Sequence, residues 1–438
     1  MHTDLAMNIV FFVIVLIAFL TTGWRQLFWV SAAGGVSPME GLSKAMMQSA
    51  AGAVELALGL VGFMTLFLGL MKVAEAGGML IVLARLIRPL MIRLFPAVPP
   101  EHPAMGAMIL NLSANMLGLG NAATPFGIKA MQELNRLNTR PGTATNAMVM
   151  FLAINTSSVT LLPTGVIALR AAAGSADPAG ILPTTLFATM CSTAIAILAA
   201  RAYQGLFPGG SGNPEEKNGA DRTEALEEES SSATEPTRAY PVWVSGSALC
   251  LLVALIPTTV FFGKAISPWI IPGLMVGFLV FGVVRRVRIY EVFVDGAKEG
   301  FQVALKIIPY LVAILVAVAM FRASGAMEAM VNWLGPWTSR VGMPAEALTM
   351  ALLRPLSGSG AFAFLASIIN DPAIGPDSYT GYLVSTLQGC TETTFYVLAV
   401  YFGAVQVRRL RHGLAAALTG DLAGIIGSVV ACSYLYGH

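Results

Sequence analysis

Long runs of apolar residues are the feature that most limits how this chain can fold. About nine of them approach or exceed the roughly 20 residues that a helix needs to cross a hydrocarbon core. They are 5–22, 53–71, 144–169, 181–200, 241–262, 269–284, 303–321, 381–405 and 413–432. Apolar residues make up 56% of the chain and charged residues 11%, whereas about a quarter of a soluble domain is charged. The sequence therefore predicts one all-α polytopic protein embedded in a lipid bilayer.

Polar residues interrupt two of these runs, one in each half of the chain. The first interruption contains Asn155, Thr156, Ser157 and Ser158, and the second contains Gln388, Thr391, Glu392 and Thr393. Polar groups are costly in hydrocarbon, so an ionisable side chain at that depth usually lines a cavity or a substrate path. Two interrupted spans in corresponding places are typical of a transporter binding site.

The segment 204–238 differs from the rest of the chain in composition. It is rich in Gly, Ser, Glu, Asn and Pro and holds too few apolar residues to form a core. Such a segment behaves as a flexible linker. We therefore expect two membrane halves, 1–203 and 239–438, joined by a linker at 204–238.

Each half contains two short apolar pieces that follow an amphipathic stretch. The amphipathic stretches, 80–95 and 328–341, are too charged to cross and are expected to lie along the membrane interface. The apolar pieces are 103–120 with 121–137 in the first half and 345–356 with 357–369 in the second. Gly, Ser and Asn break them, and none is long enough to span. They are predicted to form re-entrant helical hairpins, which exist at membrane depth only where protein or a watery cavity satisfies their backbone.

The number of spans predicts how the two halves are related. Two further runs, 241–262 and 269–284, separate one three-span unit from the next, so the second unit should begin on the opposite side as an inverted repeat. The segment 71–143 holds seven Lys or Arg and its counterpart 321–378 holds three. By the positive-inside rule the first hairpin, the linker and the amino terminus are expected on the cytoplasmic side. The run 5–22 is expected to be a retained first helix, since it lacks a basic leader and a good cleavage site.

Three segments resemble known bacterial membrane proteins. Residues 111–127, NLSANMLGLGNAATPFG, resemble the signature of the spore maturation protein A family, and 354–361, RPLSGSGA, with 391–396, TETTFY, resemble that of spore maturation protein B. The resemblance covers nearly the whole chain and implies a natural fusion of the two. Both belong to the nucleoside-recognition, or Gate, family, which also includes the membrane domain of ferrous-iron transporters. The order of elements is more distantly similar to concentrative nucleoside transporters.

This resemblance implies a location and a site. The expected location is the bacterial cytoplasmic (inner) membrane. A homo-oligomer is expected on 5–22, 241–262 and 269–284, because those transporters associate through helices outside the transport core. The carboxylate and asparagine arrangement that holds ribose in them is matched in part, by Glu392 and by Asn155 or Gln388.

Candidate solute-binding residues come from both hairpins and both interrupted spans. They are Asn111, Ser113, Asn115, Asn121, Asn155, Thr156, Ser157, Ser158, Arg354, Ser357, Ser359, Gln388, Thr391, Glu392 and Thr393. Several of them have a structural alternative. Asn111, Asn115 and Asn121 could cap broken helices, and Ser113, Ser357 and Ser359 could let helices approach closely. Arg354 could anchor a hairpin tip, and Glu392 could be paired with a neighbouring Arg or protonated.

The residues favour transport over other functions. We expect a transporter of a small polar solute, nucleoside-like or a small organic anion, coupled to a proton or a sodium ion through Glu392. A non-transporting scaffold in envelope or spore-cortex assembly is one alternative. A divalent metal permease is another, although Cys390 and Glu392 are its only plausible ligands and no His joins them.

Several function classes are not expected. The chain has neither a nucleophile elbow nor a phosphate-binding lysine loop, so neither an enzyme nor a bound cofactor is predicted. The cysteines Cys191, Cys250, Cys390 and Cys432 lie in apolar runs without metal-ligand spacing, so no structural metal site is expected. Lys and Arg gather at the ends of segments, where they orient membrane helices, so no nucleic-acid partner is predicted.

Overall fold

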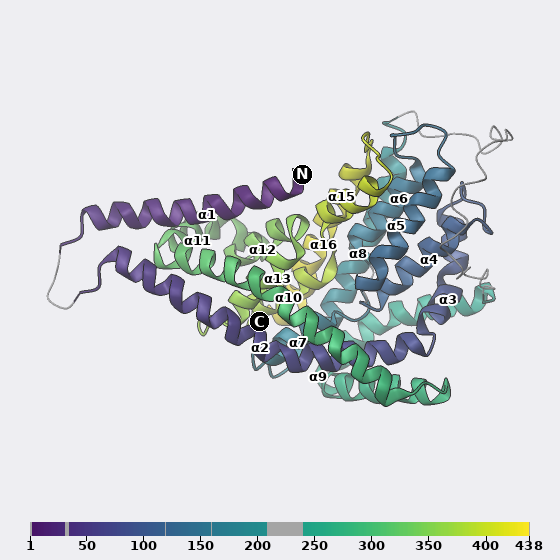
Figure 1. Cartoon of the computed structure of the whole chain (residues 1–438), viewed down its shortest axis with the longest axis horizontal. Helices are drawn as coiled ribbons and strands as arrows, with labels where there is room; N and C mark the ends of the chain where they lie inside the picture. Colours follow the sequence, from purple (N-terminus) through teal and green to yellow (C-terminus); the bar gives the residue numbers. More distant parts are fainter. Residues whose placement is uncertain (1, 31–34, 119, 159, 208–239, 438) are drawn as a thin grey trace.

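A computed structural model describes residues 2–30, 35–118, 120–158, 160–207 and 240–437 (Figure 1). The described residues form helices joined by turns, with no β-strand among them. The first half contains α1 (His2–Leu27), α2 (Pro38–Ala76), α3 (Met79–Leu94), α4 (Pro103–Met116), α5 (Gly120–Arg136), α6 (Asn146–Ser157), α7 (Thr164–Ala172), η1 (Pro178–Ile181) and α8 (Leu182–Tyr203). Apart from 204–207, the predicted linker 204–238 lies outside the described residues.

Long and short helices follow one another in a similar order in the second half. It contains α9 (Val242–Val284), α10 (Ile289–Ala323), α11 (Ala326–Thr338), η3 (Ser339–Val341), α12 (Ala345–Leu356), α13 (Gly358–Ile369), α14 (Tyr379–Cys390), α15 (Thr394–Ala404) and α16 (Gly413–Tyr436). Figure 1 shows α3–α6 toward one end of the molecule and α11–α13 toward the other, with α7, α8 and α16 between them.

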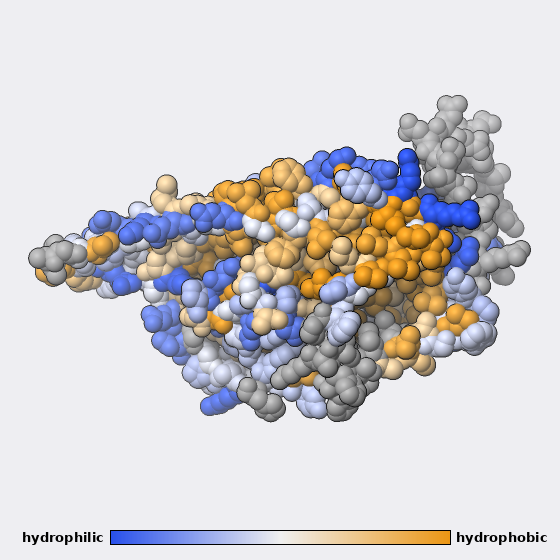
Figure 2. Space-filling view, turned by 90° about the horizontal axis from the view of Figure 1, so that it is seen from below, coloured by the Kyte–Doolittle hydropathy of each residue, from blue (hydrophilic) through white to orange (hydrophobic). Residues whose placement is uncertain are grey.

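Four of the described helices are long and apolar enough to cross a membrane. These are α2, the continuous segment Pro178–Tyr203 that includes α8, α10 and α16. Figure 2 shows a face of the molecule on which apolar residues cover a broad area, and large side chains such as Trp269, Val276 and Val280 of α9 are exposed. A monomer in water rarely exposes so much apolar surface. The chain is a multi-pass α-helical membrane protein.

The structure confirms both predicted interruptions. The run 144–169 is divided into α6 and α7, and the run 381–405 is divided into α14 and α15. The short apolar pieces are separate helices as well, with α4 packed on α5 and α12 packed on α13.

The prediction of two separate spans at 241–262 and 269–284 is wrong. Both runs belong to the single helix α9, whose 43 residues give a length of about 65 Å. Lys264 and Pro268 lie between the two runs. Keeping them inside a helix costs free energy, but ending the helix there would leave four carbonyl and four amide groups without helical partners. Counting spans between the halves therefore no longer supports their inversion.

The direction of the two interrupted segments supplies a geometric argument in its place. At one end the fully buried Arg170, near the end of α7, donates to the Pro376 carbonyl at 2.6 Å and pairs with Asp377 at 3.0 Å, just before α14. At the other end, after α15, the Arg409 carbonyl accepts from the Ala144 amide at 3.0 Å, just before α6. The end of each segment thus meets the start of the other, so α6–α7 and α14–α15 lie antiparallel.

Small residues let α8 and α16 approach closely. A Cβ atom added at Gly420 would lie 2.9 Å from the Cβ atom of Ala196, and one added at Gly424 would lie 3.3 Å from the Cβ atom of Ser192. The Ser192 hydroxyl donates to the Gly420 carbonyl at 2.8 Å. Contact between small residues, with a hydroxyl bonded across it, is how membrane helices associate without a hydrophobic driving force.

This contact predicts the effect of adding one methyl group to α16. Gly420→Ala should lower the thermal unfolding midpoint of the purified protein by several degrees, since overpacking costs about 1–3 kcal/mol. Gly277→Ala in α9 is the matched control, because nothing lies within 4 Å of a Cβ atom there. That change should leave the midpoint unchanged or raise it, because Ala favours helix over Gly. Equal midpoints for the two variants would contradict the close contact.

Candidate functional site

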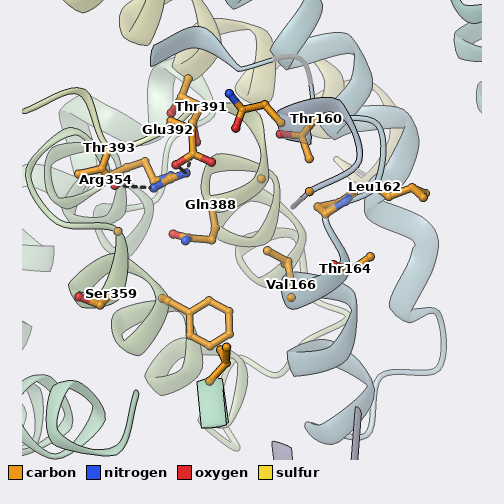
Figure 3. Close-up of a pocket in the computed structure, with 18 of the residues that line it drawn as sticks. Thr160, Leu162, Thr164, Val166, Arg354, Ser359, Gln388, Thr391, Glu392 and Thr393 are labelled. Carbon is orange, nitrogen blue, oxygen red and sulfur yellow. Dashed lines mark hydrogen bonds and ion pairs between the residues drawn. The ribbon is translucent and has the colours of Figure 1, made fainter. Parts of the chain in front are cut away.

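A pocket of about 360 Å³ lies where the two interrupted segments meet the α12–α13 turn and the end of α4 (Figure 3). Both halves of the chain contribute to its wall, and its volume suits a small ligand. Its lining residues are Met64, Asn115, Gly118, Thr160, Leu162, Pro163, Thr164, Gly165, Val166, Val303, Arg354, Gly358, Ser359, Phe362, Gln388, Gly389, Thr391, Glu392 and Thr393.

At the first break, between α6 and α7, a hydroxyl group from α8 bonds to the backbone. Helix α6 stops at Ser157, and Ser158 then has a φ of 33°, a conformation that costs energy for a residue with a side chain. Pro163, which has no amide hydrogen, precedes α7. The Thr189 hydroxyl donates to the carbonyls of Ser157 and Ser158, so α8 supplies a partner for groups that the missing helical turn leaves open.

At the second break, between α14 and α15, an arginine from α12 bonds to the backbone. Thr391 is extended, with φ −136° and ψ 167°, and its carbonyl accepts from the Arg354 guanidinium. The same guanidinium donates to the Thr393 hydroxyl at 3.0 Å. Glu392 lies between Thr391 and Thr393 in the chain. Its amide donates to the Thr156 carbonyl at 2.8 Å, so the two breaks are joined directly.

Glu392 is the one carboxylate among the residues that line the pocket. Its Oε2 atom lies 3.6 Å from Arg354 Nη2, and the Glu392 side chain is 44% exposed while that of Arg354 is 8% exposed. Figure 3 shows the two side chains facing each other, with Gln388 beside them. Arg354 is held mainly by Thr391 and Thr393, so much of the Glu392 carboxylate faces the pocket.

Amide groups behind the pocket form a network with Tyr401 of α15. The Asn115 amide donates to Asn155 Oδ1 at 2.9 Å, and the Tyr401 hydroxyl approaches the same oxygen at 3.3 Å. The Asn111 amide donates to the Tyr401 hydroxyl at 3.0 Å and to the Ala123 carbonyl at 2.8 Å. Of these residues only Asn115 reaches the pocket wall, so Asn111 and Asn155 position it from behind.

The structure brings about half of the predicted residues to the pocket wall. These are Asn115, Arg354, Ser359, Gln388, Thr391, Glu392 and Thr393. Others have structural contacts nearby: Ser357 caps α13 by accepting from the Gly360 amide at 3.0 Å, and Ser158 contacts the Thr160 hydroxyl at 3.2 Å. The hydroxyls of Ser113, Thr156 and Ser157 donate to carbonyls of their own helices. The side chain of Asn121 lies outside the described residues.

Sequence reasoning missed two polar side chains near the pocket. Tyr401 is 4% exposed and connects two predicted asparagines. Asp421 is 4% exposed in the middle of α16, and its Oδ2 atom accepts from the Thr394 hydroxyl at 2.6 Å. A single carboxylate inside an apolar run is a signal that the sequence alone could have provided. Among the described residues, no group of three or more His, Cys, Asp or Glu side chains could hold a metal ion.

These features define a class: a multi-pass helical membrane protein whose polar pocket is built on interrupted helices. The chain also matches the family model Gate, described as nucleoside recognition, at residues 57–173 and 304–408, about half of its length. The protein belongs to this family. The matched segments contain both helix pairs and both breaks.

Two different proteins of Bacillus subtilis (strain 168) are similar to this chain. Spore maturation protein B is 44% identical over 167 residues, which are 38% of this chain and 93% of that protein. Spore maturation protein A is 44% identical over 165 residues, which are 38% of this chain and 84% of that protein. The two matches are consistent with a fusion. No solved structure matches the chain.

The asparagine network predicts a difference between two tyrosines of α15. Tyr401→Phe should lower the free energy of unfolding by about 1 kcal/mol, because it removes the shared partner of Asn111 and Asn155. Tyr396→Phe should have little effect, since Tyr396 is 53% exposed. Thermal unfolding of both variants measures this, and a Tyr401→Phe midpoint at or above that of Tyr396→Phe would show that the network adds no stability.

Proposed function

We propose that this protein is a transporter of a small polar solute that binds in the pocket beside Glu392. The observation that carries the proposal is the pocket's position at the joint of two interrupted, antiparallel segments. Interrupted helices place backbone carbonyls and amides at membrane depth, where they can replace the water around a solute or ion. An exposed carboxylate at this joint supplies a charge that an arriving proton, sodium ion or solute changes.

The antiparallel segments also support an inverted repeat. In this proposal the halves 1–203 and 239–438 are related by inversion, α4–α5 and α12–α13 are re-entrant hairpins, and the fold resembles that of concentrative nucleoside transporters. The two sides of the pocket would then open alternately, as the hairpin of one half moves against the other. We place the protein in the bacterial inner membrane with a cytoplasmic amino terminus and linker.

The pocket's chemistry favours a solute with several hydrogen-bonding groups. Gln388 lines the pocket, and its Oε1 atom has no hydrogen-bond partner among the described residues, so a small rotation of the amide would let it bond to a ligand. Thr160 and Thr164 offer hydroxyls, and Phe362 offers an aromatic ring. A nucleoside-like solute would use all of these groups, in keeping with the family description, whereas a small organic anion would depend on Arg354.

A homo-oligomer is part of the proposal. The exposed apolar side chains of α1 and α9, among them Phe12, Trp24, Trp269 and Val276, lie outside the pocket-forming helices. In the membrane such a surface can pack against another copy of the chain or against lipid.

A membrane scaffold is the second candidate, and the names of the two relatives favour it. Both names refer to a cellular process, spore maturation, and neither mentions transport. A metal permease has less support, because Cys390 is buried against the Ser428 hydroxyl at 3.4 Å and does not line the pocket with Glu392.

Ligand-dependent stabilisation separates the transporter from the scaffold. We expect one class in a panel of nucleosides, small carboxylates and divalent metals to raise the unfolding midpoint, since a ligand at 100 times its Kd adds about 2.7 kcal/mol. Glu392→Gln keeps the shape of the side chain and should abolish this rise and any ion-coupled uptake by proteoliposomes. Glu328→Gln on α11 is the control and should respond like the wild type. If Glu392→Gln shows the same stabilisation and uptake as the wild type, the Glu392 carboxylate has a structural role and the site assignment fails.

The inverted arrangement predicts where two loops lie. In a variant without the native cysteines, Pro141→Cys, before α6, should react with an impermeant thiol reagent only from the cytoplasmic side. Ala373→Cys, before α14, should react only from the outer side. Both positions are exposed, so both should label. Labelling of both from the same side would contradict the inversion.

A further inference from the structure

Asp421 borders a second, much smaller cavity that shares two residues, Arg354 and Thr391, with the pocket. This cavity, of about 10 Å³, is lined by Ala351, Arg354, Pro355, Leu387, Cys390, Thr391, Asp421 and Ile425. It has room for about one water molecule. Arg354 borders the pocket and the small cavity, whereas Glu392 borders only the pocket and Asp421 only the small cavity. Arg354 thus borders both cavities, and each of the two carboxyl groups borders one of them.

Two buried polar atoms at the small cavity have no partner among the described residues. They are Asp421 Oδ1 and Arg354 Nε. The other carboxylate oxygen of Asp421 is fixed by the Thr394 hydroxyl at 2.6 Å. A buried polar atom without a partner costs free energy, so an unpartnered Oδ1 atom in a 4% exposed side chain indicates that the group binds something.

The charges around the small cavity indicate what Asp421 binds. Arg354 from α12 and Cys390 from α14 are the other titratable groups that line it. Helix α8 turns Ser192 and Ala196 toward this part of α16, and α6 has no titratable side chain. Along the two cavities, one guanidinium faces two carboxyl groups, Glu392 and Asp421. A second buried negative charge without its own partner is unfavourable, and binding a proton removes it.

We propose that Asp421 is a proton-binding site of this protein, and that Arg354 links its protonation to Glu392. In the resting state the proton is on Asp421 Oδ1, facing the small cavity, and Arg354 serves Glu392, Thr391 and Thr393. When the proton leaves through the small cavity, the Asp421 carboxylate attracts the guanidinium away from the second break. Glu392 then becomes free to bind a cation or a solute donor. The role in coupling depends on the proposed transport function, but the proton-binding site does not.

Infrared spectroscopy tests the site without any solute. The purified wild-type protein between about pH 6 and pH 8 should show the carbonyl stretch of a buried protonated carboxylic acid. Asp421→Asn should lose this band, and Glu392→Gln should retain it. A wild-type protein without the band, or a band that disappears in Glu392→Gln and persists in Asp421→Asn, would overturn the proposal. Wild-type stabilisation by a solute in Glu392→Gln would count against the proposed transport function alone, so the two failures are distinguishable.

A second variant keeps the test decisive if Asp421→Asn folds poorly. Thr394→Val removes the hydrogen bond to Oδ2 and keeps the carboxylate, so the acid band should shift in frequency without disappearing. The unfolding midpoint gives an independent readout. An unfolded aspartate loses its proton at about pH 4, so if the folded protein still holds one on Asp421, the wild-type midpoint should fall more steeply than that of Asp421→Asn as pH rises from about 5 to 7. An unshifted band in Thr394→Val, or equal slopes, would contradict a proton on Asp421.

Discussion

The hydrogen bond from the Glu392 amide to the Thr156 carbonyl joins the two breaks on which the pocket depends. Each break removes a turn of helical hydrogen bonds among buried residues, such as Ser157, Ser158 and Thr391, and buried backbone groups need partners. The chain therefore has to supply partners from other elements, and it does so with Thr189 on one side and Arg354 on the other. The bond between the breaks then fixes their relative position. Asn115, Gln388 and Glu392 lie around one cavity because of this joint, although they are far apart in sequence.

The contacts of Arg354 explain why α12 approaches the place where the two breaks meet. Its guanidinium binds one carbonyl, one hydroxyl and one carboxylate through a planar group with five hydrogens to donate. A lysine at this position has a single ammonium group, which cannot hold Thr391, Thr393 and Glu392 in the same fixed geometry. These contacts agree with the structural alternative for Arg354, an anchor, and its role as a solute ligand stays a prediction. Holding the second break is what places the Glu392 carboxylate at the pocket.

The sequence predicted the features that depend on local chemistry. Polar residues within apolar runs marked both breaks, and short Gly- and Ser-containing pieces marked the two helix pairs. The continuity of α9 was not predicted, because one lysine and one proline between two runs indicate a loop only if a helix end can be satisfied there. Nor could the sequence show that Tyr401 joins Asn111 to Asn155, since those contacts span 290 and 246 positions. Asp421 was visible as a lone carboxylate in an apolar run, but its relation to Arg354 needed the packing of α12 on α16.

The distribution of strong contacts along the two interrupted segments bears on how the pocket could open. Arg170 holds one end, stacked 4.2 Å above the Tyr382 ring and bonded to Asp377, and Arg411 holds the other through the Ala144 carbonyl and Asn146. Charge-assisted contacts of this kind resist separation. At the joint between them, Glu392 is held by a backbone hydrogen bond to Thr156 and by an ion pair with Arg354 at 3.6 Å. Under the proposed transport function, a rearrangement that opens the pocket needs to exchange the bond to Thr156 and the partners of Arg354, while the clamped ends keep the antiparallel segments in register.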